Sequence, residues 1–260
     1  MAEPFSHDEV ERYARHLVLR EVGGPGQQKL KAARVLIVGA GGLGAPAALY
    51  LAAAGVGTIG LMDGDTVGLS NLQRQVIYRT GDIGRPKVDV AAERLRDLNA
   101  HVAIRTHPDP FAGDTCGIVA EYDLVLDGTD DFAARFAVNA ACFDGGKPLV
   151  SGALGRWTGQ VAVFAAGLTK GRPPDRREPC YRCLVRDIPP DAETCAAVGV
   201  VGALAGVVGS MMALEAVKVV AGAGEPLTGR LLVYDGLGAI ARTVSLRPDP
   251  SCPVCGEAKF

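Results

Sequence analysis

Several groups of residues in this chain have the types and the spacing that chemistry requires. A glycine-rich segment, Gly39-Ala40-Gly41-Gly42-Leu43-Gly44, is followed about 20 residues later by Asp63. Glycines let the main chain turn tightly and approach a phosphate, and the N–H groups at the start of a following helix attract an anion. A carboxylate at the position of Asp63 accepts hydrogen bonds from ribose hydroxyls. Together these residues predict a nucleotide-binding site.

A polar segment follows, Ser70-Asn71-Leu72-Gln73-Arg74-Gln75. It carries side chains that hold phosphates and sugars, and it comes after a predicted strand, where open α/β sheets bind their ligands. An ordinary surface loop is the alternative. Lys87 opens a later helix, which would bring its ammonium group near the same crevice. Because lysines in first turns are usually solvated, Lys87 alone predicts little.

Carboxylates gather in the segment Asp127-Gly128-Thr129-Asp130-Asp131, directly after a predicted buried strand. Carboxylate oxygens suit Mg²⁺, which usually keeps nucleotide phosphates as further ligands. Capping of the following helix by Asp130 explains the same residues equally well. The sequence therefore leaves a magnesium site and a helix cap as two open interpretations.

Seven cysteines occur without a secretory signal, which favours metal binding or catalysis over disulfides. Two Cys-x-x-Cys pairs predict a closed shell of four thiolates around a structural Zn²⁺; their members are Cys180, Cys183, Cys252 and Cys255. A single pair would also suit a redox site, but two pairs favour a metal. Cys195 lies in a polar loop outside both pairs, whereas Cys116 and Cys142 fall in predicted helices as small core residues.

The elements that must position these residues alternate between short apolar strands and helices as far as residue 152. Strands are expected over residues 35–38, 58–62, 102–106, 124–126 and 148–151, and helices over 43–54, 88–98, 112–121 and 132–143. This alternation predicts an α/β fold with a doubly wound, Rossmann-like, mainly parallel sheet. Antiparallel strands over 159–165, 231–234 and 239–246 are expected to extend the sheet beside the zinc site.

The N-terminal region is expected to form a helical arm over residues 1–30. A helix is predicted over residues 8–19, with Ser6 or His7 near its start, and the run Gly23-Gly24-Pro25-Gly26 is expected to break it. Arg12, Arg15 and Arg20 make this helix basic, and a solvated face is the simplest interpretation. The rest of the domain divides into a Rossmann-like nucleotide-binding part over 31–152 and a zinc-binding part over 153–260.

Composition excludes several classes of protein. The chain has 260 residues, of which 48% are hydrophobic, and a net charge of −2, which predicts neither nucleic-acid nor membrane binding. Residues 196–214 carry no charge, but they are rich in glycine and alanine and are expected to form a buried helix or a subunit interface rather than a membrane span. The first residues lack an apolar signal region, so we expect a cytoplasmic protein.

Taken in order, these motifs identify a family. The chain resembles the ThiF/MoeB/HesA group of ubiquitin-activating-like adenylyltransferases along almost its whole length. The matching segments are residues 12–15 (RYAR), 39–44 (GAGGLG), 63–65 (DGD), 70–75 (SNLQRQ), 84–87 (GRPK), 127–130 (DGTD), 180–183 (CYRC), 194–195 (TC) and 252–255 (CPVC). Each segment is weak alone, but their joint occurrence in this order is highly specific.

The resemblance implies a reaction. Family members bind ATP·Mg²⁺ and the C-terminal Gly-Gly of a small ubiquitin-like sulfur-carrier protein. The carrier carboxylate attacks the α-phosphate, which gives an acyl-adenylate and pyrophosphate, and a sulfur donor later yields a thiocarboxylate. Because no rhodanese-like domain follows residue 255, the resemblance implies a separate sulfur donor.

The resemblance also assigns roles to residues. Asp63 would hold the ribose, Asn71, Arg74 and Lys87 would contact phosphates, and Asp130 would bind Mg²⁺. Further nucleotide contacts would come from Gly39, Gly41, Gly42, Gly44, Asp65, Ser70, Gln75 and Asp131.

Arg15 would reach the γ-phosphate in the site of a neighbouring subunit, which requires a homodimer. Cys195 matches a loop cysteine that forms a covalent link to the carrier in some members and is dispensable in others, so both roles stay open.

Two departures from the family pattern bear on these roles. Asp131 stands where the family commonly has asparagine, and it adds a negative charge near the expected metal. The loop over residues 168–179 is longer than is common, so contacts with the carrier there are expected to differ.

Rival interpretations are an adenylyltransferase acting on a peptide or another small carboxylate, a pseudo-enzyme that only binds a carrier, and an NAD-dependent dehydrogenase. The dehydrogenase has no use for the 70–75 loop, Lys87 or Asp130. The sequence does not indicate which biosynthetic pathway the protein serves; the candidates are those of molybdopterin, thiamine, cysteine, thiolated tRNA and specialised metabolites.

Overall fold

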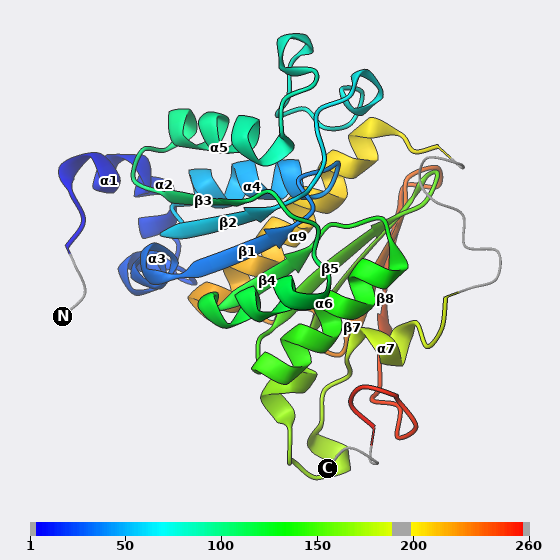
Figure 1. The fold of residues 1–260 in the computed structure, drawn as a ribbon. Helices are drawn as coiled ribbons and strands as arrows, with labels where there is room; N and C mark the ends of the chain where they lie inside the picture. The colour runs from blue at the N-terminus through cyan, green and yellow to red at the C-terminus, as the bar shows by residue number, and fades with distance from the viewer. Residues whose placement is uncertain (1–3, 189–198, 257–260) are drawn as a thin grey trace.

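A mixed sheet forms the middle layer of the molecule (Figure 1). The computed structural model describes residues 4–188 and 199–256. The sheet has 8 strands in the order β3-β2-β1-β4-β5-β6-β7-β8. Its strands are β1 (Arg34–Val38), β2 (Thr58–Met62), β3 (Ala103–His107), β4 (Leu124–Asp127), β5 (Leu149–Leu154), β6 (Thr158–Phe164), β7 (Arg230–Asp235) and β8 (Ile240–Ser245).

The two halves of the sheet differ in strand direction. Strands β3, β2, β1, β4 and β5 run parallel to one another. Strands β6, β7 and β8 continue the sheet in antiparallel pairs. The expected doubly wound parallel sheet with an antiparallel extension is therefore confirmed.

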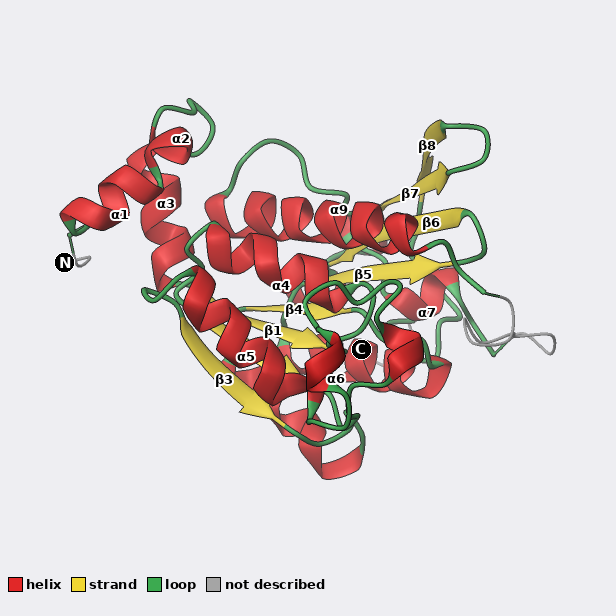
Figure 2. Ribbon diagram, turned by 90° about the horizontal axis from the view of Figure 1, so that it is seen from above, coloured by secondary structure: helices red, strands yellow, loops and turns green. Residues whose placement is uncertain are grey.

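Helices cover both faces of the sheet (Figure 2). One face carries α3 (Gly23–Ala32), α4 (Gly44–Ala53), α5 (Lys87–Leu98) and α9 (Gly202–Ala221), and the other carries α6 (Phe132–Gly145) and α7 (Tyr181–Leu184). The arm begins with α1 (His7–Arg12) and α2 (Ala14–Leu17), and short 3-10 helices occupy Leu69–Asn71, Thr80–Asp82, Gly113–Glu121, Ala166–Thr169 and Pro174–Arg176.

Helix α9 is apolar and long enough to cross a membrane, but it packs inside this fold. It lies beside α4 and against β5 and β6, and its Val208, Met212 and Ala216 are fully buried. The close contact requires small residues, since a Cβ on Gly209 would lie 2.5 Å from the Leu43 carbonyl oxygen. The helix begins at Gly202 and not at residue 196, and residues 196–198 of the expected helix lie outside the described residues.

The N-terminal arm differs from expectation in two places. The predicted helix over 8–19 is divided at Tyr13, which is 3% exposed and whose hydroxyl accepts a hydrogen bond from Asn99 Nδ2 at 2.9 Å. The glycine run at 23–26 does not merely break a helix, because it forms the first turn of α3, where Pro25 needs no N–H partner. Ser6 does cap α1, through reciprocal hydrogen bonds with Glu9.

Two further boundaries differ. Pro86 is the N-cap of α5, so that Lys87 is the first helical residue and the helix begins one residue before the expected range of 88–98. The segment expected as a helix over 112–121 is a 3-10 helix. Cys142 is a buried core residue as expected, and Cys116 is half-buried.

Candidate functional site

A cavity of ≈ 550 Å³ opens at the carboxyl ends of β1, β2 and β4. Its volume is within the roughly 300–1,000 Å³ range of small-molecule sites. Its position is the edge of a parallel sheet where α/β proteins bind ligands. The residues that line this crevice come from the glycine-rich turn, from the loops after β2 and β4, and from the first turns of α5 and α6.

The glycine-rich turn joins β1 to α4 and requires glycine for two reasons. Gly39 has a φ of +90°, which residues with a side chain rarely adopt. A Cβ on Gly44 would lie 1.8 Å from the Gly39 carbonyl oxygen, so no side chain fits there. The turn thereby brings main-chain atoms of Gly41 and Gly42 to the cavity wall.

Asp63 follows β2 and is fixed by the main chain. Its Oδ2 accepts a hydrogen bond from the Ala40 N–H at 2.8 Å, and its Oδ1 accepts one from the Asp65 N–H at 2.9 Å. Ionised carboxylates can accept about four hydrogen bonds, so capacity remains for a hydroxyl in the crevice. Burial and the charges of Asp63 and Asp65 raise the pKa of nearby Tyr78, whose hydroxyl donates to the Ala40 carbonyl at 2.8 Å.

Lys87 supplies a buried cation to the same wall. Its side chain is 6% exposed, and its Nζ lies 2.7 Å from Asp65 Oδ2 and 3.9 Å from Asp63 Oδ1. The main chain at Lys87 is fixed as well, because its N–H donates to the Asp65 carbonyl at 3.0 Å. The ammonium group is therefore held at the crevice before any anion arrives.

The 70–75 loop presents Arg74 and Asn71 to the cavity. Arg74 Nη1 donates to the Ser70 carbonyl at 3.0 Å, and Asn71 Oδ1 accepts from the Gly68 N–H at 3.0 Å. Gln75 is 3% exposed, and its Oε1 has no hydrogen-bond partner in the described part of the chain. The loop packs so closely on the start of α9 that a Cβ on Gly202 would lie 2.0 Å from the Gln73 carbonyl oxygen.

A buried ion pair organises the loop after β4. Asp127 is 1% exposed, and its Oδ2 lies 3.5 Å from Arg135 Nη1. Its Oδ1 accepts hydrogen bonds from the Thr129 N–H at 3.1 Å and from the Thr129 hydroxyl at 2.7 Å. Arg135 also donates to the Thr129 carbonyl and, at 2.8 Å, to the Gly152 carbonyl. These contacts fix the main chain beside Asp130, whose exposed side chain lines the cavity.

The cap of α6 is Asp131 and not Asp130. Asp131 Oδ2 accepts a hydrogen bond from the Ala134 N–H at 2.7 Å. The interpretation of Asp130 as the cap is therefore wrong, and Asp130 is left with its carboxylate in the crevice. Magnesium usually takes one or two carboxylates and completes its shell with water and phosphate oxygens, so Asp130 beside a bound nucleotide fits that requirement.

The structure brings most of the expected nucleotide-binding residues into one cavity. Those that line it are Gly39, Gly41, Gly42, Asp63, Asp65, Asn71, Arg74, Gln75, Lys87, Asp130 and Asp131. Gly44 lies beneath the turn, and Ser70 contributes only its carbonyl oxygen to the loop. Cys195 lies outside the described residues.

Arg15 is exposed and lies far from the cavity of its own chain. Two hydrogen bonds join the arm to α5 and α4, which begin at the crevice, at the ends of these helices that lie away from it. Arg12 Nη1 donates to the carbonyl of Leu98, where α5 ends, and Gln27 Nε2 donates to the carbonyl of Ala54, just after α4. Arg15 is absent from the residues that line the crevice. Any phosphate contact by Arg15 would therefore have to be made in another subunit.

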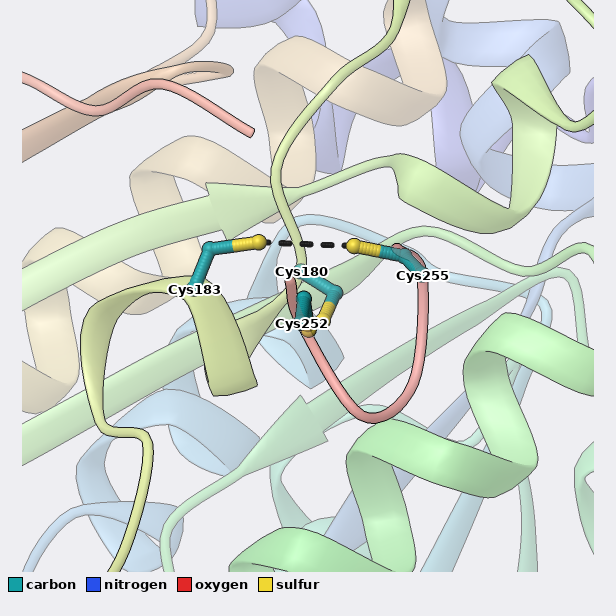
Figure 3. A group of neighbouring side chains, drawn as sticks. All are labelled: Cys180, Cys183, Cys252 and Cys255. Atoms are coloured by element: carbon teal, nitrogen blue, oxygen red, sulfur yellow. Dashed lines mark hydrogen bonds between the residues drawn. The ribbon is translucent and has the colours of Figure 1, made fainter. Parts of the chain in front are cut away.

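The four paired cysteines converge around one point, next in the chain to Tyr181 of the crevice lining (Figure 3). Their sulfur atoms all lie within 4.8 Å of one another, and the closest pairs are Cys183–Cys255 at 3.3 Å and Cys180–Cys252 at 3.6 Å. Four sulfurs bound to one Zn²⁺ at 2.3 Å would lie about 3.8 Å apart, so the cluster fits that ion. No second group of three or more potential ligands occurs within residues 4–188 and 199–256.

Sequence reasoning missed several residues of the site. Arg135 was not considered, although it is the only charged residue of the helix expected over 132–143, a pattern that suggests a buried ion pair. Phe111, Phe132 and Tyr181 also line the cavity. No local signal marks these aromatic residues, because their position depends on long-range packing.

Comparison with known proteins gives a consistent result. A model of the ThiF family matches residues 13–254. The sulfur carrier protein adenylyltransferase of Thermus thermophilus is 47% identical over 256 residues, which cover 97% of this chain and 93% of that protein. The molybdopterin-synthase adenylyltransferase of Escherichia coli is 46% identical over 259 residues, covering 99% of this chain and 100% of that protein.

Other relatives are longer or more distant. The probable adenylyltransferase/sulfurtransferase MoeZ of Mycobacterium tuberculosis is 47% identical over 259 residues, which cover 98% of this chain but 65% of that protein. A crystal structure of MccB from Escherichia coli superposes with a TM-score of 0.80 at 21% identity, covering 97% of this chain and 76% of that one. At that identity the superposition supports the fold alone.

Proposed function

The chain belongs to the ThiF family, and from that premise we propose that it is an ATP-dependent adenylyltransferase that activates the C-terminal glycine of a small ubiquitin-like sulfur-carrier protein. One observation carries the proposal. The crevice combines a glycine-rich turn with the buried ammonium group of Lys87, the guanidinium group of Arg74 and the exposed carboxylate of Asp130. A dehydrogenase needs only the turn and Asp63. The remaining charged residues suit the transfer of a nucleotide.

In the proposed reaction an oxygen of the carrier carboxylate attacks the α-phosphorus of ATP. The new P–O bond gives an acyl-adenylate, and the bond to the bridging oxygen breaks, so that pyrophosphate leaves with that electron pair. Phosphoryl chemistry of this kind depends on positioning and on neutralisation of charge. Lys87 and Arg74 would neutralise phosphate oxygens, and Asp63 would hold the ribose through its hydroxyls.

Two metals are part of the proposal. Mg²⁺ would be held by Asp130 together with the phosphates, and it would supply positive charge to the leaving pyrophosphate. Zn²⁺ would be held by Cys180, Cys183, Cys252 and Cys255 as a structural ion. Elemental analysis tests the second assignment, with about one zinc per chain as the expected result.

The assembly is also part of the proposal. Because Arg15 lies at the far end of α4 and α5 from its own crevice, we propose a homodimer in which Arg15 contacts the γ-phosphate bound by the other subunit. Sulfur would then come to the acyl-adenylate from a separate donor protein. We propose a cytoplasmic location for this chemistry.

The decisive test is isotope exchange between ATP and pyrophosphate. We expect exchange only when a ubiquitin-like carrier with a free Gly-Gly end is present, and none with the same carrier after removal of its last glycine. Exchange that is independent of any carrier would contradict the proposed substrate. Enhanced NADH fluorescence on mixing with the protein would instead support the dehydrogenase.

The arm is tested separately. Mixing Arg15→Ala subunits with Asp130→Ala subunits should restore part of the exchange activity, because a mixed dimer contains one crevice with both residues. Failure of the mixture to exceed the sum of its components would exclude a contribution from the neighbouring subunit.

A further inference from the structure

The crevice is formed by two different parts of the fold. Asp63, Arg74 and Lys87, which we call the polar end, come from the chain between β2 and the start of α5. A second set, which we call the apolar end, comes from α6, β5, α7 and the segment before α9 and lies in sequence beside the polar 129–131 segment: Phe132, Ala153, Leu154, Tyr181 and Val200. If the triphosphate occupies the polar end, as the proposed function requires, the apolar end remains for the tail of the second substrate.

Tyr181 is the most firmly held of these apolar-end residues. It is 5% exposed, and its ring packs against Phe164 at a centroid distance of 5.7 Å and against Phe136 at 6.0 Å. The guanidinium carbon of Arg135 lies 6.0 Å from the ring centroid. Because three neighbours surround the ring, it cannot move away from an incoming chain without losing packing.

The main chain of Tyr181 is equally constrained. The residue lies between Cys180 and Cys183, and its N–H donates to Asn139 Oδ1 on α6 at 2.8 Å. The next side chain, Arg182, places its guanidinium carbon 4.1 Å from the Phe136 ring centroid, also on α6. The cysteine cluster and α6 therefore fix the residue from both sides, and Figure 1 shows α7 beside α6.

We propose that Tyr181 determines specificity for a glycine tail, with the cysteine cluster holding its ring in place. A rigid aromatic wall leaves room for a main chain without side chains but collides with an added methyl group. Overpacking against a wall that cannot yield is destabilising. This inference rests on the proposed function, and it assigns to the cysteine cluster a second role beyond joining the C-terminal region to the fold.

The test compares two substrates. The first is the ubiquitin-like carrier of the same organism that supports exchange, with its Gly-Gly end intact, and the second is that carrier with its last glycine replaced by alanine. A difference of one methyl group is typically worth 10–200-fold in kcat/KM. We expect the native protein to favour the glycine-ended carrier within about that range.

Substitutions at Tyr181 should change that ratio. Tyr181→Phe keeps the ring and should keep the ratio, whereas Tyr181→Leu frees space and should reduce it to within a few-fold of unity. The KM for ATP should be the same in all three proteins, because the polar end is untouched. An unchanged ratio in Tyr181→Leu would overturn the proposal.

A second variant leaves the ring itself intact. Asn139→Ala removes the acceptor for the Tyr181 N–H, so the ratio should fall although the side chain is unaltered. Removal of zinc by a chelator should weaken carrier binding, measured by calorimetry, about tenfold without changing the affinity for ATP. If the ratio is unchanged in Asn139→Ala and the carrier affinity is unchanged after chelation, the contacts of the Tyr181 main chain and the cysteine cluster do not position its ring.

The two proposals fail in different ways. If the native protein shows no carrier-dependent exchange, the proposed function fails whatever Tyr181 does. If exchange occurs and the ratio is the same in Tyr181→Leu, only the role of Tyr181 is lost.

Discussion

The parallel and antiparallel halves of the sheet hold their functional residues by different means. In the parallel half, β1, β2 and β4 are almost wholly buried, and the polar residues at the ends of β2 and β4 are fixed by main-chain or buried partners. In the antiparallel half, all of β8 is exposed, and the chain beyond it meets the fold at the four-cysteine cluster. Packing fixes the first half, whereas we propose that a structural Zn²⁺ at this cluster stabilises the second.

Loss of the metal should have the largest effect and should act on stability. Structural zinc sites contribute on the order of 10 kcal/mol of apparent binding free energy. Cys252→Ser should therefore lower the thermal unfolding midpoint by about 10 °C or more, measured by calorimetry. Cys116→Ser makes the same chemical change outside the cluster and should have little effect. An unaltered midpoint in a zinc-free Cys252→Ser protein would remove the distinction between the halves.

The buried ion pair lies within the parallel half, because Arg135 contacts both the β4 loop and Gly152 of β5. Arg135→Met should cost about 3–5 kcal/mol in the free energy of unfolding, since it leaves the Asp127 carboxylate buried without its cation. Adding Asp127→Asn should recover part of that loss by removing the charge. Chemical denaturation measures both. Equal stability of the single and double variants would show that the charge itself is unimportant.

A crevice substitution should act on rate and leave stability unchanged. Arg74→Ala should reduce carrier-dependent ATP–pyrophosphate exchange by about 10²–10³-fold, because a positioned donor near the reacting phosphates is lost. Asp130→Ala should act in the same direction. Arg79→Ala removes an exposed arginine outside the cavity and serves as the matched control. Full activity in Arg74→Ala would show that the site assignment is wrong.

The smallest expected effect concerns Asp131. Asp131→Ala removes the N-cap of α6 and should cost about 1 kcal/mol of stability. Asp131→Asn keeps a side-chain oxygen for the Ala134 N–H and should be nearly neutral in stability and exchange. Urea denaturation distinguishes them. A large loss of exchange in Asp131→Asn would instead give this carboxylate a direct role at the metal.

The success of the sequence-based predictions varied with how local each signal was. The alternation of apolar strands with helices fixed the parallel half, because each element carries its own pattern and crossover rules leave few arrangements. The helix over residues 8–19 was wrong at Tyr13, whose burial against Gly55 and Asn99 no local pattern reveals. The glycine run that opens α3 was misjudged because this helical turn packs against the end of α9, where a Cβ on Gly26 would meet Ala221.

The site was predictable where a motif is contiguous. The glycine-rich turn, Asp63 and the Cys-x-x-Cys pairs were found because spacing alone restricts their chemistry. The choice between a magnesium site and a helix cap for Asp130 required coordinates, since adjacent carboxylates differ only in direction. The Asp127–Arg135 pair and the aromatic wall depend on contacts between elements. The catalytic roles of the crevice residues stay predictions until exchange is measured.

Gly44 and Arg74 are subject to different selective pressures, one from folding and one from activity. A side chain there would destroy the turn whether or not catalysis is needed, because its first carbon would lie 1.8 Å from a main-chain oxygen. Arg74 donates a hydrogen bond to its own loop, at the Ser70 carbonyl, so loss of its guanidinium group should leave the fold intact. In a lineage that no longer requires the activity, position 74 would drift while position 44 stayed glycine. Comparing positions 44 and 74 in related sequences would therefore distinguish proteins that keep the activity from proteins that keep only the fold.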